Sequence, residues 1–135
     1  MNSKPSLNEI KNGLKYLKKF EVAIYGSYVS GFFNSRSDID IAIVTRKTDP
    51  KQNKEIWKNA LKKSRQNYHL NVFELLPLNV KAEIMDNFIA LFGDRIEISE
   101  YFYHFRKLWK DAKHRHFENQ FSNFKEKISK IKATV

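Results

Sequence analysis

Cysteine is absent from this 135-residue chain, and glycine and proline are scarce, with four and three copies. The absence of cysteine excludes disulfide bonds, thiolate zinc sites and cysteine nucleophiles. No stretch approaches the ~18 apolar residues of a membrane span. The polar start of the chain, 1–5, also lacks the apolar core of a secretory signal. We therefore expect a soluble, cytoplasmic protein with no membrane partner.

Acidic residues are also few, with 15 Asp and Glu against 25 Lys and Arg, which gives a formal net charge of +10. A basic surface suits polyanionic partners such as nucleotides, nucleic acids or anionic membranes, but it does not choose among them. Hydrophobic residues make up 41% of the sequence, which is enough for a globular core. The length predicts one domain, 1–135.

The hydrophobic pattern alternates between helical and strand periodicity, which indicates a mixed α/β (α+β) chain. Strands are predicted where short apolar or alternating runs occur, over about 22–25, 39–43, 69–75 and 88–92. Helices are predicted where apolar residues recur every three or four positions, over about 7–19, 50–61 and 79–86.

The last third of the chain, 95–135, is predicted to be a long C-terminal helical extension. One apolar stripe steps by three and four residues through Ile98, Tyr101, Phe105, Leu108 and Ala112, and a second through Phe117, Phe121, Phe124, Ile128 and Ile131. The step between the two stripes is five, so the helix either breaks near Arg115 or packs its tail on a different partner. Packing within the chain or in a homo-oligomer is our main expectation for this tail, and a dedicated partner surface is the alternative.

A glycine–serine turn follows the first predicted strand. Gly26 and Ser27 come directly after an apolar run, and a short helix is predicted beyond them. Glycine lets backbone amides approach a ligand closely, and the free N–H groups at a helix start suit a phosphate. The Ser27 hydroxyl adds a hydrogen bond, and Gly31 lets the chain turn back. This segment is therefore a candidate phosphate cradle.

Two carboxylates follow on the next predicted strand. Asp38 and Asp40 are two residues apart, so they project from the same face. Such a pair is costly unless a cation lies between them, and Mg²⁺ is commonly held by one or two carboxylates plus substrate phosphates. The combination indicates phosphoryl or nucleotidyl transfer. A solvated Asp-x-Asp strand beside an ordinary glycine turn is the alternative interpretation.

The run GSYVSGFFNSRSDIDIAIV carries a family resemblance. Gly26-Ser27, ten intervening residues and Asp38-Ile39-Asp40 resemble the signature of the DNA polymerase beta-like nucleotidyltransferase superfamily, and most closely its minimal nucleotidyltransferases. The resemblance implies a small mixed β-sheet flanked by helices. It also implies transfer of a nucleoside monophosphate from a nucleoside triphosphate, with ATP and AMP expected, to a hydroxyl acceptor.

The resemblance also implies roles for individual residues. Gly26 and Ser27 would bind the triphosphate, and Asp38 and Asp40 would bind Mg²⁺ in a two-metal site. Ser37 is a further candidate for nucleotide binding. Arg36 lies near the acids and is a candidate phosphate contact, although a loop arginine is more often solvated.

A third carboxylate, usual in the family, should project from the next strand. The inward positions on that strand are His69 and Asn71, and neither is acidic. Glu74 is the nearest acid, but it has the opposite strand parity unless a bulge intervenes. The second metal site and the catalytic rate are therefore expected to be weakened.

Three functions stay open at this point. The first is a Mg²⁺-dependent nucleotidyltransferase, which by resemblance suggests an antitoxin that adds AMP to a HEPN-type toxin partner. The second is a catalytically weak nucleotide- or partner-binding subunit of the same fold. The third is a basic nucleic-acid-binding module that uses the +10 charge and is indifferent to loss of Asp38.

Overall fold

The computed structural model describes the backbone of residues 4–34, 36–65 and 67–133, and the side chains of these residues through Arg115 together with Glu118 and Asn119. Its centre is a four-stranded mixed sheet in the order β3-β2-β1-β4. The strands are β1 (Glu21–Tyr25), β2 (Ile39–Val44), β3 (Tyr68–Val72) and β4 (Ile89–Phe92). Strand β1 runs antiparallel to both β2 and β4, whereas β2 and β3 are parallel. The predicted mixed α/β class is confirmed, and the four strands lie within about three residues of their predicted bounds.

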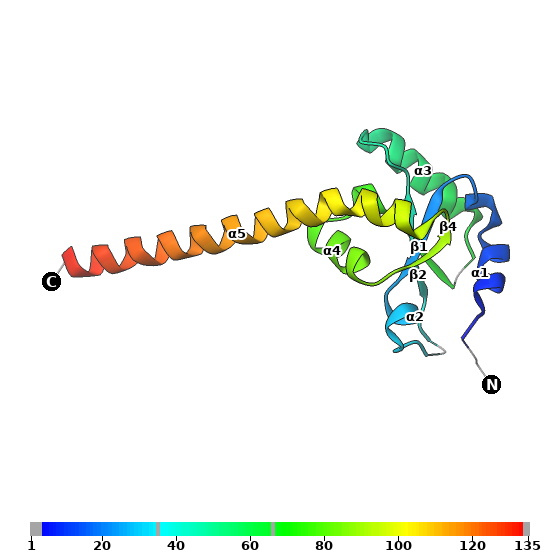
Figure 1. Cartoon of the computed structure of the whole chain (residues 1–135), viewed down its shortest axis with the longest axis horizontal. Helices are drawn as coiled ribbons and strands as arrows, with labels where there is room; N and C mark the ends of the chain where they lie inside the picture. Colours follow the sequence, from blue (N-terminus) through cyan, green and yellow to red (C-terminus); the bar gives the residue numbers. More distant parts are fainter. Residues whose placement is uncertain (1–3, 35, 66, 134–135) are drawn as a thin grey trace.

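Helices cover both faces of this sheet (Figure 1). Helices α1 (Leu7–Gly13) and α3 (Pro50–Lys63) pack on the face formed by the isoleucines and leucines of the strands. Helices α4 (Leu78–Asp86) and α5 (Arg95–Ala133) pack on the other face, to which the strands contribute small residues such as Ala23 and Ala42. Because both faces are buried, the two central strands β1 and β2 are nearly continuous apolar runs, whereas the edge strand β3 alternates.

The first helix is shorter than predicted. It ends at Gly13, and a separate 3₁₀ turn, η1 (Lys15–Leu17), replaces the rest of the 7–19 prediction. A Cβ at Gly13 would lie 2.5 Å from the hydroxyl of Tyr68, so the glycine makes room for that ring at a cost in helix propensity. The apolar residues of η1 still reach the core, since Leu17 is 2% exposed.

Strand β3 also ends earlier than the predicted 69–75. After Val72 the chain forms a second 3₁₀ turn, η2 (Phe73–Leu75). Phe73 is fully buried and stacks on Phe102 of α5 with ring centroids 4.5 Å apart. The turn therefore joins the sheet to α5 through an aromatic contact.

Helix α5 runs from Arg95 to Ala133 and extends away from the sheet (Figure 1). Its backbone is helical through Arg115, so the break considered there is not present. Phe102 is 1% exposed while Leu108 is 51% exposed, so the core-facing stripe differs from the predicted one. A helix with 3.6 residues per turn points residues 98, 102, 105 and 109 the same way, which explains the difference.

The tail stripe of Phe117, Phe121, Phe124, Ile128 and Ile131 lies outside the side chains that the structure describes. The packing predicted for it, and the assignment of 1–135 as one domain, both stay predictions. None of the described helices is long and apolar enough to cross a membrane.

Glu74 links the end of β2 to α5 through hydrogen bonds. Its carboxylate accepts hydrogen bonds from the backbone N–H groups of Thr45 (3.1 Å) and Arg46 (2.9 Å) and from the hydroxyl of Tyr101 (2.7 Å). Burial and the hydrogen bond to Glu74 raise the pKa of Tyr101 far above its ordinary value, so this phenol stays a donor at all physiological pH values. Glu74 is therefore fully engaged as a structural residue.

Replacing Tyr101 by Phe removes this charge-assisted hydrogen bond and leaves the ring in place. We expect the free energy of unfolding to fall by about 1.5–3 kcal/mol, the usual contribution of a hydrogen bond to a charged group. Urea denaturation followed by circular dichroism measures it. The matched control is Tyr103→Phe on the same helix, where the side chain is 64% exposed and the change should be within about 0.5 kcal/mol. Equal stabilities for the two variants would contradict this role of Glu74.

Candidate active site

Gly26 and Asp40 are in direct contact at one end of the sheet. Gly26 follows β1 with a φ of +73°, in the region that favours glycine. A Cβ added at this position would collide with Oδ2 of Asp40. Tyr25, the residue before the glycine, is the register partner of Asp40 across β1 and β2. The sheet therefore places the predicted cradle and the second predicted acid side by side.

The segment after Gly26 forms the expected short helix, α2 (Ser27–Ser30). The Gly26 carbonyl accepts hydrogen bonds from the N–H groups of Val29 and Ser30, both at 3.1 Å. Gly31 ends the helix in the left-handed conformation with a φ of +88°, which reverses the chain as predicted. Ser27 is half-buried at the start of this helix, next to the glycine.

The loop before β2 carries three further candidates. Arg36 and Asp38 are exposed, and Ser37 is half-buried. The Ser37 hydroxyl accepts a hydrogen bond from the Asn34 N–H at 3.2 Å, which fixes the loop. Asp38 immediately precedes β2, which begins at Ile39, so only Asp40 of the two acids belongs to the strand. The pair thus lies at the entry of β2, partly open to solvent.

His69 occupies the position next to Asp40 on β3. The two residues are register partners in the parallel pairing. Nδ1 of His69 lies 3.0 Å from Oδ1 of Asp40, and the imidazole is 60% exposed. Together with the Gly26 contact at Oδ2, this hydrogen bond orients the Asp40 carboxylate.

Asn71 lies two residues further along β3 and faces the same side of the sheet. Its amide donates a hydrogen bond of 3.3 Å to the hydroxyl of Tyr25, which is 6% exposed. Burial raises the pKa of Tyr25, and the nearby carboxylates of Asp40 and Glu83 raise it further. The phenol therefore stays protonated beside the acids.

Glu74 lies at the other end of the sheet. It binds the backbone of Thr45 and Arg46, which follow β2, whereas Asp40 lies near the start of that strand. Of the three candidates for the third position, His69 contacts Asp40, Asn71 contacts the neighbouring Tyr25, and Glu74 lies near the far end of β2.

The donor atoms at the Asp38–Asp40 site suit a magnesium ion. Two carboxylates beside a glycine–serine turn are hard oxygen ligands, and phosphate oxygens would complete the coordination. Among the described residues, no group of three or more His, Cys, Asp or Glu side chains is arranged to hold a metal by itself. Asp38 and Asp40 would supply two oxygen ligands to such an ion, and the remaining ligands would come from a bound nucleotide.

Two groups of side chains on α5 have ordinary structural roles. Nε2 of His114 lies 3.0 Å from the Glu118 carboxylate, a pair one helical turn apart on α5. The side chain of His116 lies outside the described residues. In the aromatic run on α5, Phe102 is buried and Tyr103 is 64% exposed.

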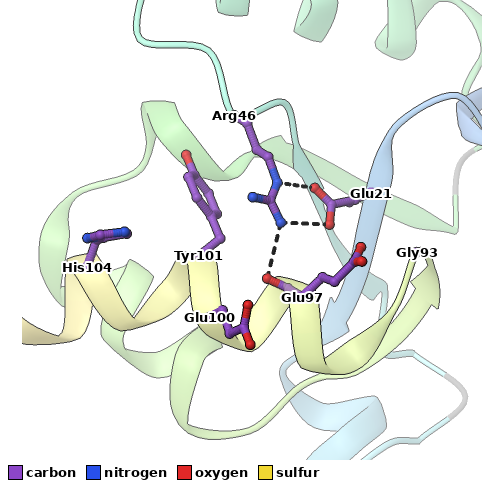
Figure 2. A pocket seen from close by; sticks show the side chains of 7 residues that line it. All are labelled: Glu21, Arg46, Gly93, Glu97, Glu100, Tyr101 and His104. Atoms are coloured by element: carbon purple, nitrogen blue, oxygen red, sulfur yellow. Dashed lines mark hydrogen bonds and ion pairs between the residues drawn. The ribbon is translucent and has the colours of Figure 1, made fainter.

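A hollow of about 530 Å³ opens near the opposite end of the sheet (Figure 2). Arg46 crosses it, pairs with both carboxylate oxygens of Glu21 and donates to the Glu97 carbonyl. The Arg46 guanidinium also lies over the Tyr101 ring at 4.7 Å. Arg46 thus already uses its charge within the chain, and this hollow serves the packing of α5.

Sequence reasoning missed Tyr25 and Glu83. The sequence indicates Tyr25 only as the last residue of a strand, whereas antiparallel pairing places it opposite Asp40. Its position directly before the glycine–serine turn was the available signal. Glu83 comes from α4, and no local pattern connects that helix with the acids.

Comparison with known proteins places this geometry in a family. Residues 7–91 match the family model described as a nucleotidyltransferase domain. A Methanocaldococcus jannaschii protein named as a protein adenylyltransferase is 40% identical over 111 residues, covering 82% of this chain and 86% of that protein.

Solved structures share the fold at lower identity. A toxin–antitoxin crystal structure with AMP-PNP is 22% identical with a TM-score of 0.57, over 86% of this chain and 94% of that one. The tri-AMPylated Shewanella oneidensis HEPN toxin in complex with its MNT antitoxin supplies another match, 16% identical with a TM-score of 0.53, over 84% of this chain and 93% of that one.

The family match covers more than half of the chain and includes Gly26, Ser27, Asp38 and Asp40. The predicted resemblance and the prediction of an enzyme are both confirmed. The chain belongs to the nucleotidyltransferase domain family and is a nucleotidyltransferase.

Proposed function

We propose that this enzyme transfers AMP from ATP to a hydroxyl group of a protein, with Mg²⁺ bound by Asp38 and Asp40. The observation that carries the proposal is the contact of the Asp40 carboxylate with Gly26, because it brings a metal-binding acid to a phosphate-binding turn. The name of the 40% identical relative supports a protein as acceptor.

The reaction is an in-line substitution at the α-phosphorus. The acceptor oxygen forms a bond to this phosphorus, the bond to the bridging oxygen of the β-phosphate breaks, and pyrophosphate leaves with the electron pair. The hydroxyl proton passes to solvent. Mg²⁺, when bound, neutralises the phosphate charge and polarises the phosphorus–oxygen bonds.

The residues of this chain orient the reactants. Gly26 lets its backbone approach the triphosphate, and the Ser27 hydroxyl donates to a phosphoryl oxygen. Ser37 and Arg36 lie in the loop that precedes the acids and complete the phosphate contacts. His69 holds Oδ1 of Asp40, so that the carboxylate keeps one orientation.

We also propose a HEPN-type toxin as the protein acceptor, which makes this chain an antitoxin. The support is the fold, shared with antitoxin chains that were crystallised with HEPN toxins. The chain carries a net charge of +10, which favours an acidic partner. A cytoplasmic location is part of the same proposal.

Replacing Asp38 and Asp40 together by Ala should lower the rate of AMP transfer by about 1,000-fold or more, which corresponds to ~4 kcal/mol of transition-state stabilisation. The acids are partly exposed, so the fold should persist. Intact-mass spectrometry of a co-purified acceptor measures AMP addition. The charge-matched control is Asp86→Ala with Asp111→Ala, both exposed and outside the site. Transfer at the wild-type rate in the Asp38/Asp40 variant would refute the assignment.

Removal of Mg²⁺ should weaken ATP binding by about tenfold or more, because two carboxylates repel the triphosphate when no cation lies between them. Calorimetric titration with ATP, in Mg²⁺ and in EDTA, measures this effect. In the Asp38→Ala, Asp40→Ala variant the two titrations should converge. An ATP affinity independent of Mg²⁺ in the wild type would contradict a metal role for these acids.

A catalytically weak relative is the second candidate, because His69 and Asn71 stand where the family has an acid. Asn71→Asp should raise the transfer rate by about tenfold, or ~1.4 kcal/mol, if this position faces the reacting groups. Asn71 also donates a hydrogen bond to the Tyr25 hydroxyl, so Tyr25→Phe combined with Asn71→Asp shows whether a rate change depends on that hydroxyl. An unchanged rate in Asn71→Asp would show that a missing carboxylate at this position does not limit the enzyme.

A further inference from the structure

A hollow of about 300 Å³ opens at the outer edge of β3, between that strand and α3. Trp57, Val72 and two leucines of the following turn form its apolar walls. The indole N–H of Trp57 donates a 2.8 Å hydrogen bond to the Leu70 carbonyl, which fixes the ring against the strand. The hollow is therefore a fixed apolar site beside an edge strand.

Two lysines line the same hollow. Lys54 and Lys58 are four residues apart on α3, so they lie on the same side of the helix, and both are exposed. Among the residues that the structure describes, none with an acidic side chain lines this hollow. An apolar wall with two adjacent cations is complementary to an apolar side chain flanked by carboxylates.

The hollow lies at β3, on the side of Asp40 away from the phosphate turn after β1. The sheet order is β3-β2-β1-β4, with the phosphate turn after β1 and the acids at β2. In-line substitution places the attacking oxygen opposite the leaving pyrophosphate. If the triphosphate lies toward β1, the acceptor hydroxyl arrives from β3. Strand β3 is one of the two edge strands of the sheet.

The distances allow one segment to reach both places. Asn71 lines the hollow and lies two residues beyond His69, which contacts Asp40. Two residues of strand span about 6.6 Å. Trp57 and Val72 belong to the α3 face of the sheet, whereas Asp40 and His69 lie on the opposite face. An extended segment that crosses the edge of β3 can therefore place its hydroxyl at Asp40 and an apolar side chain, two to four residues away, in the hollow.

We infer that the hollow at the edge of β3 is the docking site for the protein acceptor, and that the acceptor segment carries an apolar side chain flanked by acidic residues. This inference rests on the proposed function, because it assumes AMP transfer to a protein. It assigns acceptor selection to Trp57, Lys54 and Lys58, which take no part in nucleotide binding.

The test uses the fluorescence of Trp57 in the full chain, with Trp109→Phe as background so that one indole reports. The probe is the peptide acetyl-Asp-Glu-Leu-Glu-Tyr-Gly-amide. We expect a saturable shift of the Trp57 emission. Replacing Leu in the peptide by Ser should weaken binding by about tenfold, the effect of losing one buried apolar side chain. Replacing its acids by Lys should abolish binding.

Charge reversal on the protein tests the two lysines. Lys54→Glu with Lys58→Glu should weaken peptide binding by about tenfold or more. The matched control, Lys51→Glu with Lys62→Glu, changes the charge of the same helix by the same amount outside the hollow and should leave binding within about twofold. The ATP affinity should be the same in both variants. Equal peptide binding by both variants would overturn the inference.

Other ligands decide between this inference and its competitors. A Trp57 shift caused by adenosine would make the hollow a nucleoside pocket, and a shift caused by a single-stranded oligonucleotide would make it a nucleic-acid site. Either result would overturn a protein docking site. The fluorescence titration needs neither ATP nor turnover, so it tests docking alone. Failure of the proposed function would appear in a separate assay, as the absence of AMP on the peptide tyrosine with the wild-type protein.

Discussion

The contact between the Asp40 carboxylate and the backbone of Gly26 is the constraint on which the site depends. Any side chain at position 26 would occupy the space of this carboxylate, and the φ of +73° also favours glycine. The contact exists because β1 and β2 pair with Tyr25 opposite Asp40. The contact therefore depends on the strand register as well as on the glycine and the acid. A shift of one residue in the pairing would turn Asp40 to the other face.

The two ends of the sheet use their charges in opposite ways. At the far end, the Arg46 side chain pairs with Glu21, and its backbone N–H donates to Glu74. These contacts hold Arg46 at a φ of +59°. At the site end Asp38, Arg36 and the outer side of His69 stay open to solvent. The charged side chains that hold α5 are paired with one another, and solvent-exposed charges remain at the end of the sheet where we propose that the nucleotide binds.

Local patterns were sufficient for much of the fold and for the glycine–serine and Asp-x-Asp part of the site. The buried strands and the start of α3 at Pro50 follow from short-range signals such as apolar runs and the Asp49 cap. The rest depends on contacts between distant residues. The Tyr68 ring needs the space beside Gly13. Phe102 instead of Leu108 faces the core, and Glu74 binds the Thr45 N–H from 29 residues away. The parity argument identified His69 and Asn71 as the inward pair, but not the phenol of Tyr25 between them and Gly26.

The length of α5 affects how the protein behaves in solution. Its 39 residues span about 58 Å at 1.5 Å per residue. A compact chain of this size has a radius of gyration of only about 14 Å. The protein should therefore diffuse and elute as a larger particle than a sphere of 16.1 kDa. An early peak in gel filtration is then no proof of a dimer, and the subunit number of this nucleotidyltransferase has to be measured by a method that reports mass independently of shape.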